Sequence, residues 1–113
     1  MKEIKAIIQP HVLNRVMDKL HQLPHFSGVT VTDCQGQGRG LGAGGHYEPT
    51  AESIFFAKRT KLELFCADDV CDEVVRVIRE ASHTGNAGDG VISVADLDRV
   101  VRIRSGEERD RAV

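Results

Sequence analysis

Residues 36–45 read GQGRGLGAGG, and the interpretation of this stretch decides the fold of the whole chain. It contains GLGAGG at residues 40–45, which matches the G-x-G-x-x-G pattern of dinucleotide-binding folds. That pattern binds a pyrophosphate only where a strand enters the glycines and a helix leaves them. Here the glycines are followed by HYEP at residues 46–49, and Pro49 falls where a helix would be in its second turn. We therefore interpret the stretch as part of a long loop.

The segments before this loop predict a strand, a helix and a second strand. Residues 2–8, KEIKAII, form a short apolar-rich run before a proline, which is typical of a buried strand. Apolar side chains then recur at helical spacing over residues 13–23, and Pro24 ends that helix. Residues 29–34, VTVTDC, alternate with a period of two, so they predict a strand that leads into the glycines.

The segments after the loop repeat this order. Residues 60–66, TKLELFC, alternate again, with the leucines and the cysteine on one face. The two aspartates at 68–69 are typical of a helix start, as caps and as charges favoured by the helix dipole, ahead of a helical pattern over residues 70–81. A glycine-broken turn then leads to predicted strands at residues 91–94 and 100–104.

Two βαβ halves joined by a long loop predict one domain, residues 1–113, with a ferredoxin-like βαββαβ fold. This α+β sandwich has one antiparallel sheet with both helices on the same face. No helix is left to cover the other face, so we expect the chain to self-associate. A connection of about twenty residues without structure of its own is usually functional in so small a domain.

Composition excludes several classes of function. The net charge of −2 over 113 residues provides no basic patch for nucleic acid. No apolar run approaches the roughly 18 residues of a membrane span, and the initial MKEI lacks the apolar core of a signal peptide. The three cysteines are odd in number and lack C-x-x-C spacing, which favours reduced thiols. We therefore expect a cytoplasmic protein that neither inserts into membranes nor binds nucleic acid.

Two other stretches have the chemistry of phosphate binding. Residues 84–90, TGNAGDG, place three glycines in a turn whose backbone N–H groups can converge on an anion. In residues 101–107, VRIRSGE, Arg102 and Arg104 are two positions apart, so on an extended segment both guanidinium groups point to the same side. Taken singly, a plain turn and a solvated charged face explain these stretches. Taken together, they favour phosphate binding.

Six motifs in this order resemble the PII nitrogen-regulatory signalling proteins, and the resemblance runs from residue 1 to about residue 108. The motifs are MKEIKAIIQP at residues 1–10, GVTVT at 28–32, G-x-G-R at 36–39, KLE at 61–63, TG-x-x-GDG at 84–90 and VRIRSGE at 101–107. The last two are specific to that family. The chain is therefore identified as a divergent, PII-like member.

The resemblance implies a homotrimer of ferredoxin-like subunits that binds ATP, ADP or AMP in the clefts between neighbours. It also implies that residues of about 38–58 form a T-loop that contacts the target protein, and that the tail of about 106–113 is flexible. The adenine pocket implied by position contains Ile7, Thr30, Glu63 and Phe65. The implied phosphate contacts are Gly36, Gly38 and Arg39, the turn residues Gly88, Asp89 and Gly90, and, from the partner side, Arg102 and Arg104.

Several positions depart from the family pattern. Gly40 replaces a glutamine that helps to hold Mg²⁺ and 2-oxoglutarate. Glycine has no side-chain oxygen, which argues against 2-oxoglutarate but does not exclude Mg²⁺. Val91 replaces a phosphate-binding lysine, which favours weaker triphosphate binding or a preference for ADP or AMP. Arg59 corresponds to the lysine that pairs with 2-oxoglutarate, and Glu52 to a tyrosine that many members have uridylylated. Together with Tyr47, which lies in the loop without aligning to that tyrosine, they are the candidate effector or partner contacts.

The resemblance implies a regulator rather than an enzyme. Such a protein would bind adenine nucleotide and, through the T-loop, control a partner enzyme, a membrane transporter or another regulator in nitrogen utilisation. The spacing places no nucleophile beside a base, so no catalytic residue is predicted. Slow ATP hydrolysis in the cleft is compatible with this role.

The alternative is a PII-like or copper-tolerance-like trimer that responds to metal ions or bicarbonate. Soft ligands are present in His46 beside Tyr47 and Glu48, and in Cys66 with Cys71 near a helix start. No tight pair spacing joins them, and buried structural thiols are the simpler explanation. We therefore predict no metal site, and a nucleotide-binding measurement separates the two functions.

Overall fold

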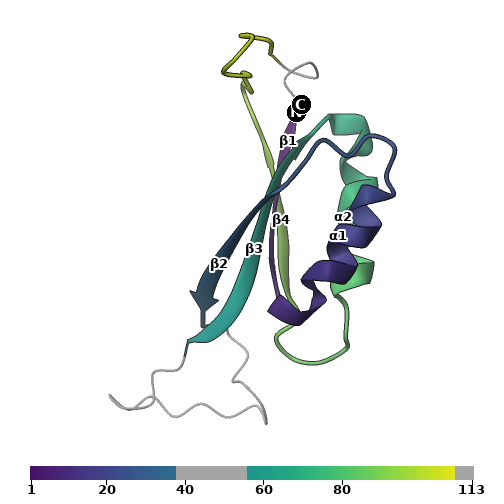
Figure 1. The fold of residues 1–113 in the computed structure, drawn as a ribbon, viewed down its shortest axis with the longest axis vertical. Coiled ribbons are helices and arrows are strands. Elements are labelled where there is room, and N and C mark those ends of the chain that lie inside the picture. Colours follow the sequence, from purple (N-terminus) through teal and green to yellow (C-terminus); the bar gives the residue numbers. More distant parts are fainter. Residues whose placement is uncertain (38–55, 109–113) are drawn as a thin grey trace.

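The computed structural model describes residues 1–37 and 56–108. Its strands and α-helices follow the predicted order up to Asp96 (Figure 1). A short 3₁₀ turn precedes each α-helix. The elements are β1 (Lys2–Ile8), η1 (Pro10–Val12), α1 (Leu13–His21), β2 (Thr30–Gly36), β3 (Ala57–Cys66), η2 (Asp68–Val70), α2 (Cys71–Ser82) and β4 (Gly90–Asp96). The predictions made for residues 38–55 and 109–113 lie outside the described residues.

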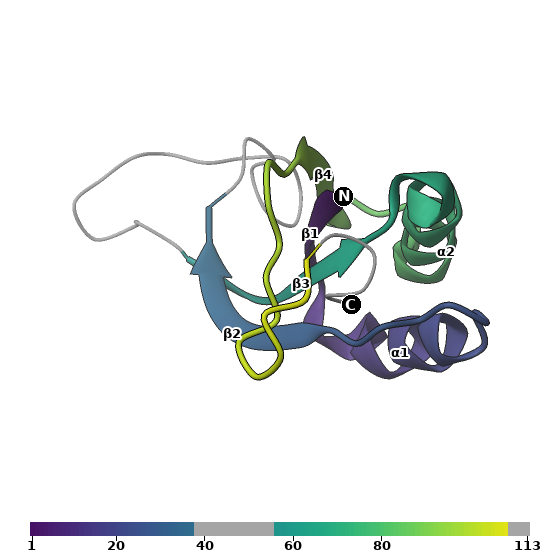
Figure 2. The same cartoon turned by 90° about the horizontal axis from the view of Figure 1, so that it is seen from above.

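The strands form one antiparallel sheet in the order β2-β3-β1-β4. β1 pairs on both sides, so that Lys2 stands opposite Cys66 of β3 and Asp96 of β4. Both helices lie on the same face of the sheet (Figure 2). The ferredoxin-like α+β fold is therefore confirmed. The dinucleotide-binding fold does not apply, because the strands that flank residues 38–55 are antiparallel.

The hydrophobic core lies between the helices and the face of the sheet that they cover. Every second residue is buried through most of β1 and the second half of β3, because successive side chains of a strand point to opposite faces. Leu62, Leu64 and Cys66 share one face, as predicted, and that face is buried. The largest fully buried side chains are Ile4, Ile8, Leu20, Leu62, Ile78, Val12 and Val16.

The two strands next to residues 38–55 are longer than predicted. β2 continues to Gly36 and β3 begins at Ala57, which pair with each other. β1 ends at Ile8, opposite Thr60, so the β2–β3 ribbon extends beyond the end of β1 (Figure 1). The base of the predicted T-loop is therefore a hydrogen-bonded ribbon with a fixed register.

The helix boundaries differ from the prediction. α1 ends at His21, and the chain continues with i→i−3 hydrogen bonds that tighten its last turn. The aspartates at 68–69 do not cap α2, which begins at Cys71 without a side-chain cap. Asp68 instead accepts a hydrogen bond from the N-terminal ammonium group of Met1 over 2.8 Å. In the described residues, no helix is long and apolar enough to cross a membrane.

The segment after β4 is a tight hairpin, so the strand predicted for residues 100–104 is wrong. The backbone N–H of Gly106 donates to the carbonyl oxygen of Arg102 over 2.8 Å. Gly106 has a φ of 73°, which favours glycine, and this residue turns the chain back on itself. Arg102 and Arg104 therefore do not lie on an extended segment, and alternation does not set the directions of their side chains.

Neither helix covers the second face of the sheet, as predicted (Figure 2). The strand alternation and the register place on it Glu3, Lys5, Ile7, Lys61, Glu63, Phe65 and Val91. Nζ of Lys61 and Oε1 of Glu63 are 3.4 Å apart, so charges on this face can pair within the subunit. The open face is thus a mixture of charged and apolar side chains.

Candidate functional site

The four residues predicted to contact adenine all lie on the open face of the sheet. Thr30 of β2 stands opposite Glu63 of β3, and Phe65 lies two positions further along β3 on the same face. Ile7 of β1 also faces this side, opposite Lys61. Phe65 is 40% exposed, so its ring offers a surface for stacking with a planar base. The structure therefore places these four residues on a common surface.

One carboxylate organises the turn at residues 84–90, which joins α2 to β4. Asp89 accepts hydrogen bonds from the backbone N–H groups of Thr84, at 2.8 Å, and Gly85, at 3.0 Å. It also accepts a hydrogen bond from the hydroxyl group of Thr84. That hydroxyl in turn accepts the N–H of Asn86 over 3.2 Å. Because the carboxylate is occupied inside the turn, its direct role is to shape the backbone.

The pKa of Asp89 lies below the ordinary value, chiefly because the Thr84 hydroxyl donates to the ionised carboxylate, and then because of the backbone N–H groups. Aspartate in the unfolded chain has a pKa of about 3.9, so the stability from these bonds is complete above that pH and is lost as pH falls through the folded pKa.

We expect Asp89→Asn to lower the melting temperature by a few degrees at neutral pH, and the difference from wild type to shrink below about pH 4. Thermal unfolding at both pH values checks this, with Asp18→Asn on the exposed face of α1 as control.

The second half of the turn has backbone donors to spare. The N–H groups of Ala87 and Gly88 have no acceptor among the described residues. Gly88 and Gly90 have φ values of 89° and 109°, which side-chain-bearing residues rarely adopt. A Cβ atom on Gly90 would lie 1.8 Å from the carbonyl oxygen of Ile7. The backbone itself therefore requires both glycines, and the free N–H groups have the character of an anion-binding nest.

Two side chains reach this turn from neighbouring segments. Gln9, which follows β1, donates from Nε2 to the carbonyl oxygen of Gly88 over 2.7 Å. Nη2 of Arg59 lies 3.1 Å from the point where Gly88 would carry a Cβ atom. The Cβ position of Gly36 is 4.0 Å from Cγ of Arg59, so the same side chain also contacts the end of β2. The sequence assigned no role to Gln9. The one available signal was its position between the predicted strand of residues 2–8 and Pro10.

Arg102 and Arg104 do not meet the turn in the same chain. The turn leads into Gly90, the first residue of β4, whereas the arginines follow Asp96, the last one (Figure 1). A strand rises about 3.3 Å per residue, so the length of β4 separates the two groups by roughly 20 Å. One subunit therefore does not bring the two parts of the predicted phosphate site together.

The other predicted contacts belong to the segment between β2 and β3. Two were assigned to phosphates and two to an effector or partner. They are Gly38, Arg39, Tyr47 and Glu52, and all lie outside the described residues.

Cys66 and Cys71 are buried at the other end of β3 from the glycine turn. Burial, followed by the neighbouring Cys71, raises the pKa of the Cys66 thiol to about 12. A thiol with so high a pKa stays protonated at neutral pH and is a poor nucleophile. In the part of the chain that the structure describes, no three His, Cys, Asp or Glu side chains gather as metal ligands.

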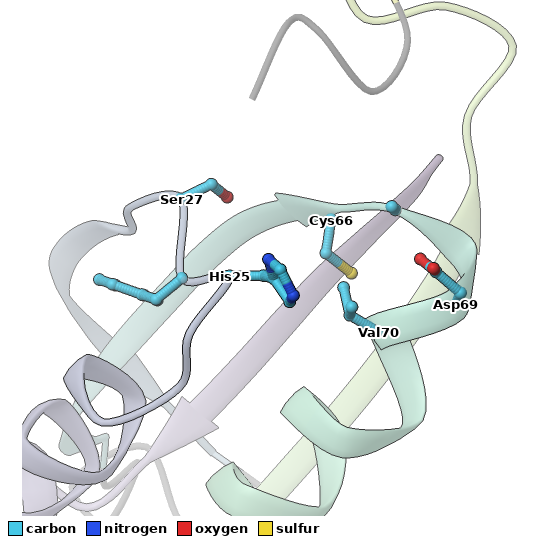
Figure 3. A pocket seen from close by; sticks show the side chains of 7 residues that line it. His25, Ser27, Cys66, Asp69 and Val70 are labelled. Carbon is cyan, nitrogen blue, oxygen red and sulfur yellow. The ribbon is translucent and has the colours of Figure 1, made fainter.

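A cavity of about 470 Å³ opens beside Cys66 (Figure 3). His25 and Ser27 line it from the segment after α1, and Asp69 and Val70 line it from η2. Its lining includes none of the predicted nucleotide contacts. This cavity is therefore not the predicted nucleotide site.

Comparison with known proteins gives one consistent result. The family model described as Nitrogen regulatory protein P-II matches residues 1–107. Nitrogen regulatory protein GlnK of Escherichia coli (strain K12) is 39% identical over 113 residues, the full length of both chains. The nitrogen regulatory proteins P-II of Klebsiella oxytoca and Azospirillum brasilense are 40% and 37% identical, again over 100% of each chain. These matches and the ferredoxin-like fold show that the chain belongs to the nitrogen regulatory protein P-II family.

Proposed function

We propose that this chain is a signalling regulator that binds an adenine nucleotide between the subunits of a homotrimer. The observation that carries the proposal is the separation of the glycine turn from Arg102 and Arg104 within one chain. A polyphosphate is bound where backbone donors and cations meet. The described part of one subunit has these groups at opposite ends of β4, so a neighbouring subunit is needed to complete the site.

The open face of the sheet supports such an assembly. Phe65 and Val91 are 40% and 62% exposed on it, next to charged side chains such as Glu63 and Lys5. Interfaces between subunits combine apolar contacts with polar pairs in this way. Two copies that meet across this face would also enclose the surface that carries the four predicted adenine contacts.

The proposed ligand is ATP, ADP or AMP. The base would lie against the Phe65 surface, and the phosphates would reach the N–H groups of the turn and the arginines of the neighbour. Because the Val91 side chain carries no positive charge, the third phosphate of ATP should add little to the binding free energy. ADP and AMP should therefore compete well with ATP. Gly40 offers no side-chain oxygen to a metal ion or an oxo acid, so we expect weak binding of 2-oxoglutarate.

The proposed output is regulation of a partner protein in nitrogen utilisation. The relatives are named as nitrogen regulatory proteins, and this supports the same role here. Residues 38–58 would contact an enzyme, a transporter or another regulator in the cytoplasm. Arg59 links the base of this segment to the turn, since its Nη2 lies 3.1 Å from the Cβ position of Gly88 and its Cγ 4.0 Å from that of Gly36. Nucleotide at the turn therefore has a short physical route to the partner-binding segment.

Replacing Arg102 by alanine should weaken ADP binding about tenfold or more, because a hydrogen bond to a charged group contributes roughly 1.5–3 kcal/mol. Isothermal titration calorimetry on the full chain measures this, with ATP, AMP and 2-oxoglutarate as further ligands. Arg76→Ala is the matched control, since Arg76 is exposed on α2 and pairs with Glu80. The control should bind ADP as the wild type does.

Two results would contradict the proposed function. One is an unchanged ADP affinity in Arg102→Ala, and the other is a monomer mass by light scattering at micromolar concentration. Heat from metal ions or bicarbonate, with none from any nucleotide, would instead favour the alternative function.

A further inference from the structure

Gln9 is held in place by the chain on both sides of it. Its backbone is extended, with φ of −67° and ψ of 138°, and the following Pro10 favours that conformation in the residue before it. Its carbonyl oxygen accepts the N–H of Val12 over 3.2 Å and so closes η1. The Gln9 side chain therefore starts from a fixed piece of backbone between β1 and α1.

The far end of the same side chain is fixed on the glycine turn. Nε2 of Gln9 donates to the carbonyl oxygen of Gly88 over 2.7 Å. This nitrogen lies 3.0 Å, and Nη2 of Arg59 3.1 Å, from the point where Gly88 would carry a Cβ atom. Two side chains thus use the space that is open because residue 88 is glycine. The contact joins β1, the turn and the start of β3 at one place.

We propose that Gln9 is a positioning residue for phosphate binding, which holds the Gly88–Asp89 peptide and the donors beside it in the orientation that a phosphate needs. A peptide group is planar and trans, so holding the Gly88 carbonyl also sets the direction of the Asp89 N–H. Gly88 and Gly90 would otherwise give this part of the turn wide conformational freedom. The inference rests on the proposed function, because it assumes that phosphates bind at the turn.

The turn is held at two separate points. The Asp89 carboxylate holds its beginning through Thr84 and Gly85, and Gln9 holds its end through the Gly88 carbonyl. Without the second bond, the end of the turn would have to be ordered when the ligand arrives. Ordering at that moment lowers affinity without removing any contact to the ligand. The loss should affect ligands with phosphates and spare those without.

Gln9→Met removes the donor and keeps the length of the side chain. In calorimetry on the full-length chain, we expect ADP affinity to fall about tenfold and adenosine affinity to stay unchanged. Gln22→Met is the matched control, because Gln22 is exposed at the other end of α1 and should affect neither ligand. In the ligand-free variant, amide hydrogen exchange at Thr84 and Gly85 should also become faster, since the turn loses one of its two attachments.

An ADP affinity within about twofold of the wild type would overturn the role of Gln9, and so would an equal loss for adenosine. Unchanged amide exchange in the turn would overturn it as well. Wild-type protein that binds no ADP overturns the proposed function and the phosphate role of Gln9 together. Wild-type protein that binds ADP, with an unaffected Gln9→Met variant, overturns only the role of Gln9.

Discussion

Gly90→Ala is expected to lower the free energy of unfolding by about 4 kcal/mol or more, because a methyl group has no place there. Gly90 begins β4 opposite Ile8, where two backbones approach closely. The new Cβ atom would lie 1.8 Å from the carbonyl oxygen of Ile7 and 2.9 Å from its carbonyl carbon. Both atoms belong to the backbone of β1, which is paired on both sides and cannot move away. Denaturant titration at a fixed subunit concentration measures the loss.

Gly85→Ala separates this clash from backbone strain. Gly85 has a comparable positive φ of 87°, but no heavy atom lies within 4 Å of its Cβ position. Strain alone should therefore destabilise this variant by only about 1–2 kcal/mol. If the two variants lost the same stability, the close approach of Gly90 to β1 would not be the cause.

Ile78→Ala should cost about 2–5 kcal/mol, because it leaves a cavity in the centre of the core. Ile78 is 0% exposed in the middle of α2, between the helix and the covered face of the sheet. The surrounding strands are fixed by their ladders and can collapse little into the space. The same denaturant titration measures this, together with the slope of the transition, which should not change.

Val77→Ala is the control for this prediction, because Val77 lies next to Ile78 on the same helix and is only partly buried. Its loss of two methyl groups should lower stability by less than about 1.5 kcal/mol. Alanine has the higher helix propensity at both positions, so a loss as large as that of Ile78→Ala would mean that the degree of burial does not decide the effect.

The fold was predictable because its periodic patterns are clear and its elements short. Residues 2–8 were predicted with the bounds that β1 has, since a proline marks the end of the apolar run. The segment 100–104 failed because V-R-I-R alternation resembles that of a strand whether or not a partner strand exists. Among the described residues, pairing of this segment is limited to one isolated antiparallel bridge between Val101 and Glu108, and Ile103 is 101% exposed. Alternation shows a capacity for pairing, and only the surroundings show whether pairing occurs.

The candidate site was predictable in its residue types more than in its connections. The glycines of the turn are visible in sequence, because few other residues adopt a positive φ. The bond from Gln9 to Gly88 joins residues 79 positions apart and leaves no local pattern. The internal role of the Asp89 carboxylate was missed for a different reason, since an aspartate between glycines can face inward or outward. Three-dimensional contacts decide between these possibilities.

The order of strands in the sheet determines when each strand can pair while the chain is being synthesised. Every ladder joins a strand from residues 1–37 to one from residues 56–108, and neither half contains a ladder of its own. On the ribosome, β1 and β2 must therefore wait until β3 has emerged before either finds its native partner. β1 keeps one free edge until Asp96 has been synthesised. The two sequence halves resemble each other in pattern, yet neither can complete its part of the sheet without the other, so we expect them to fold as one cooperative unit.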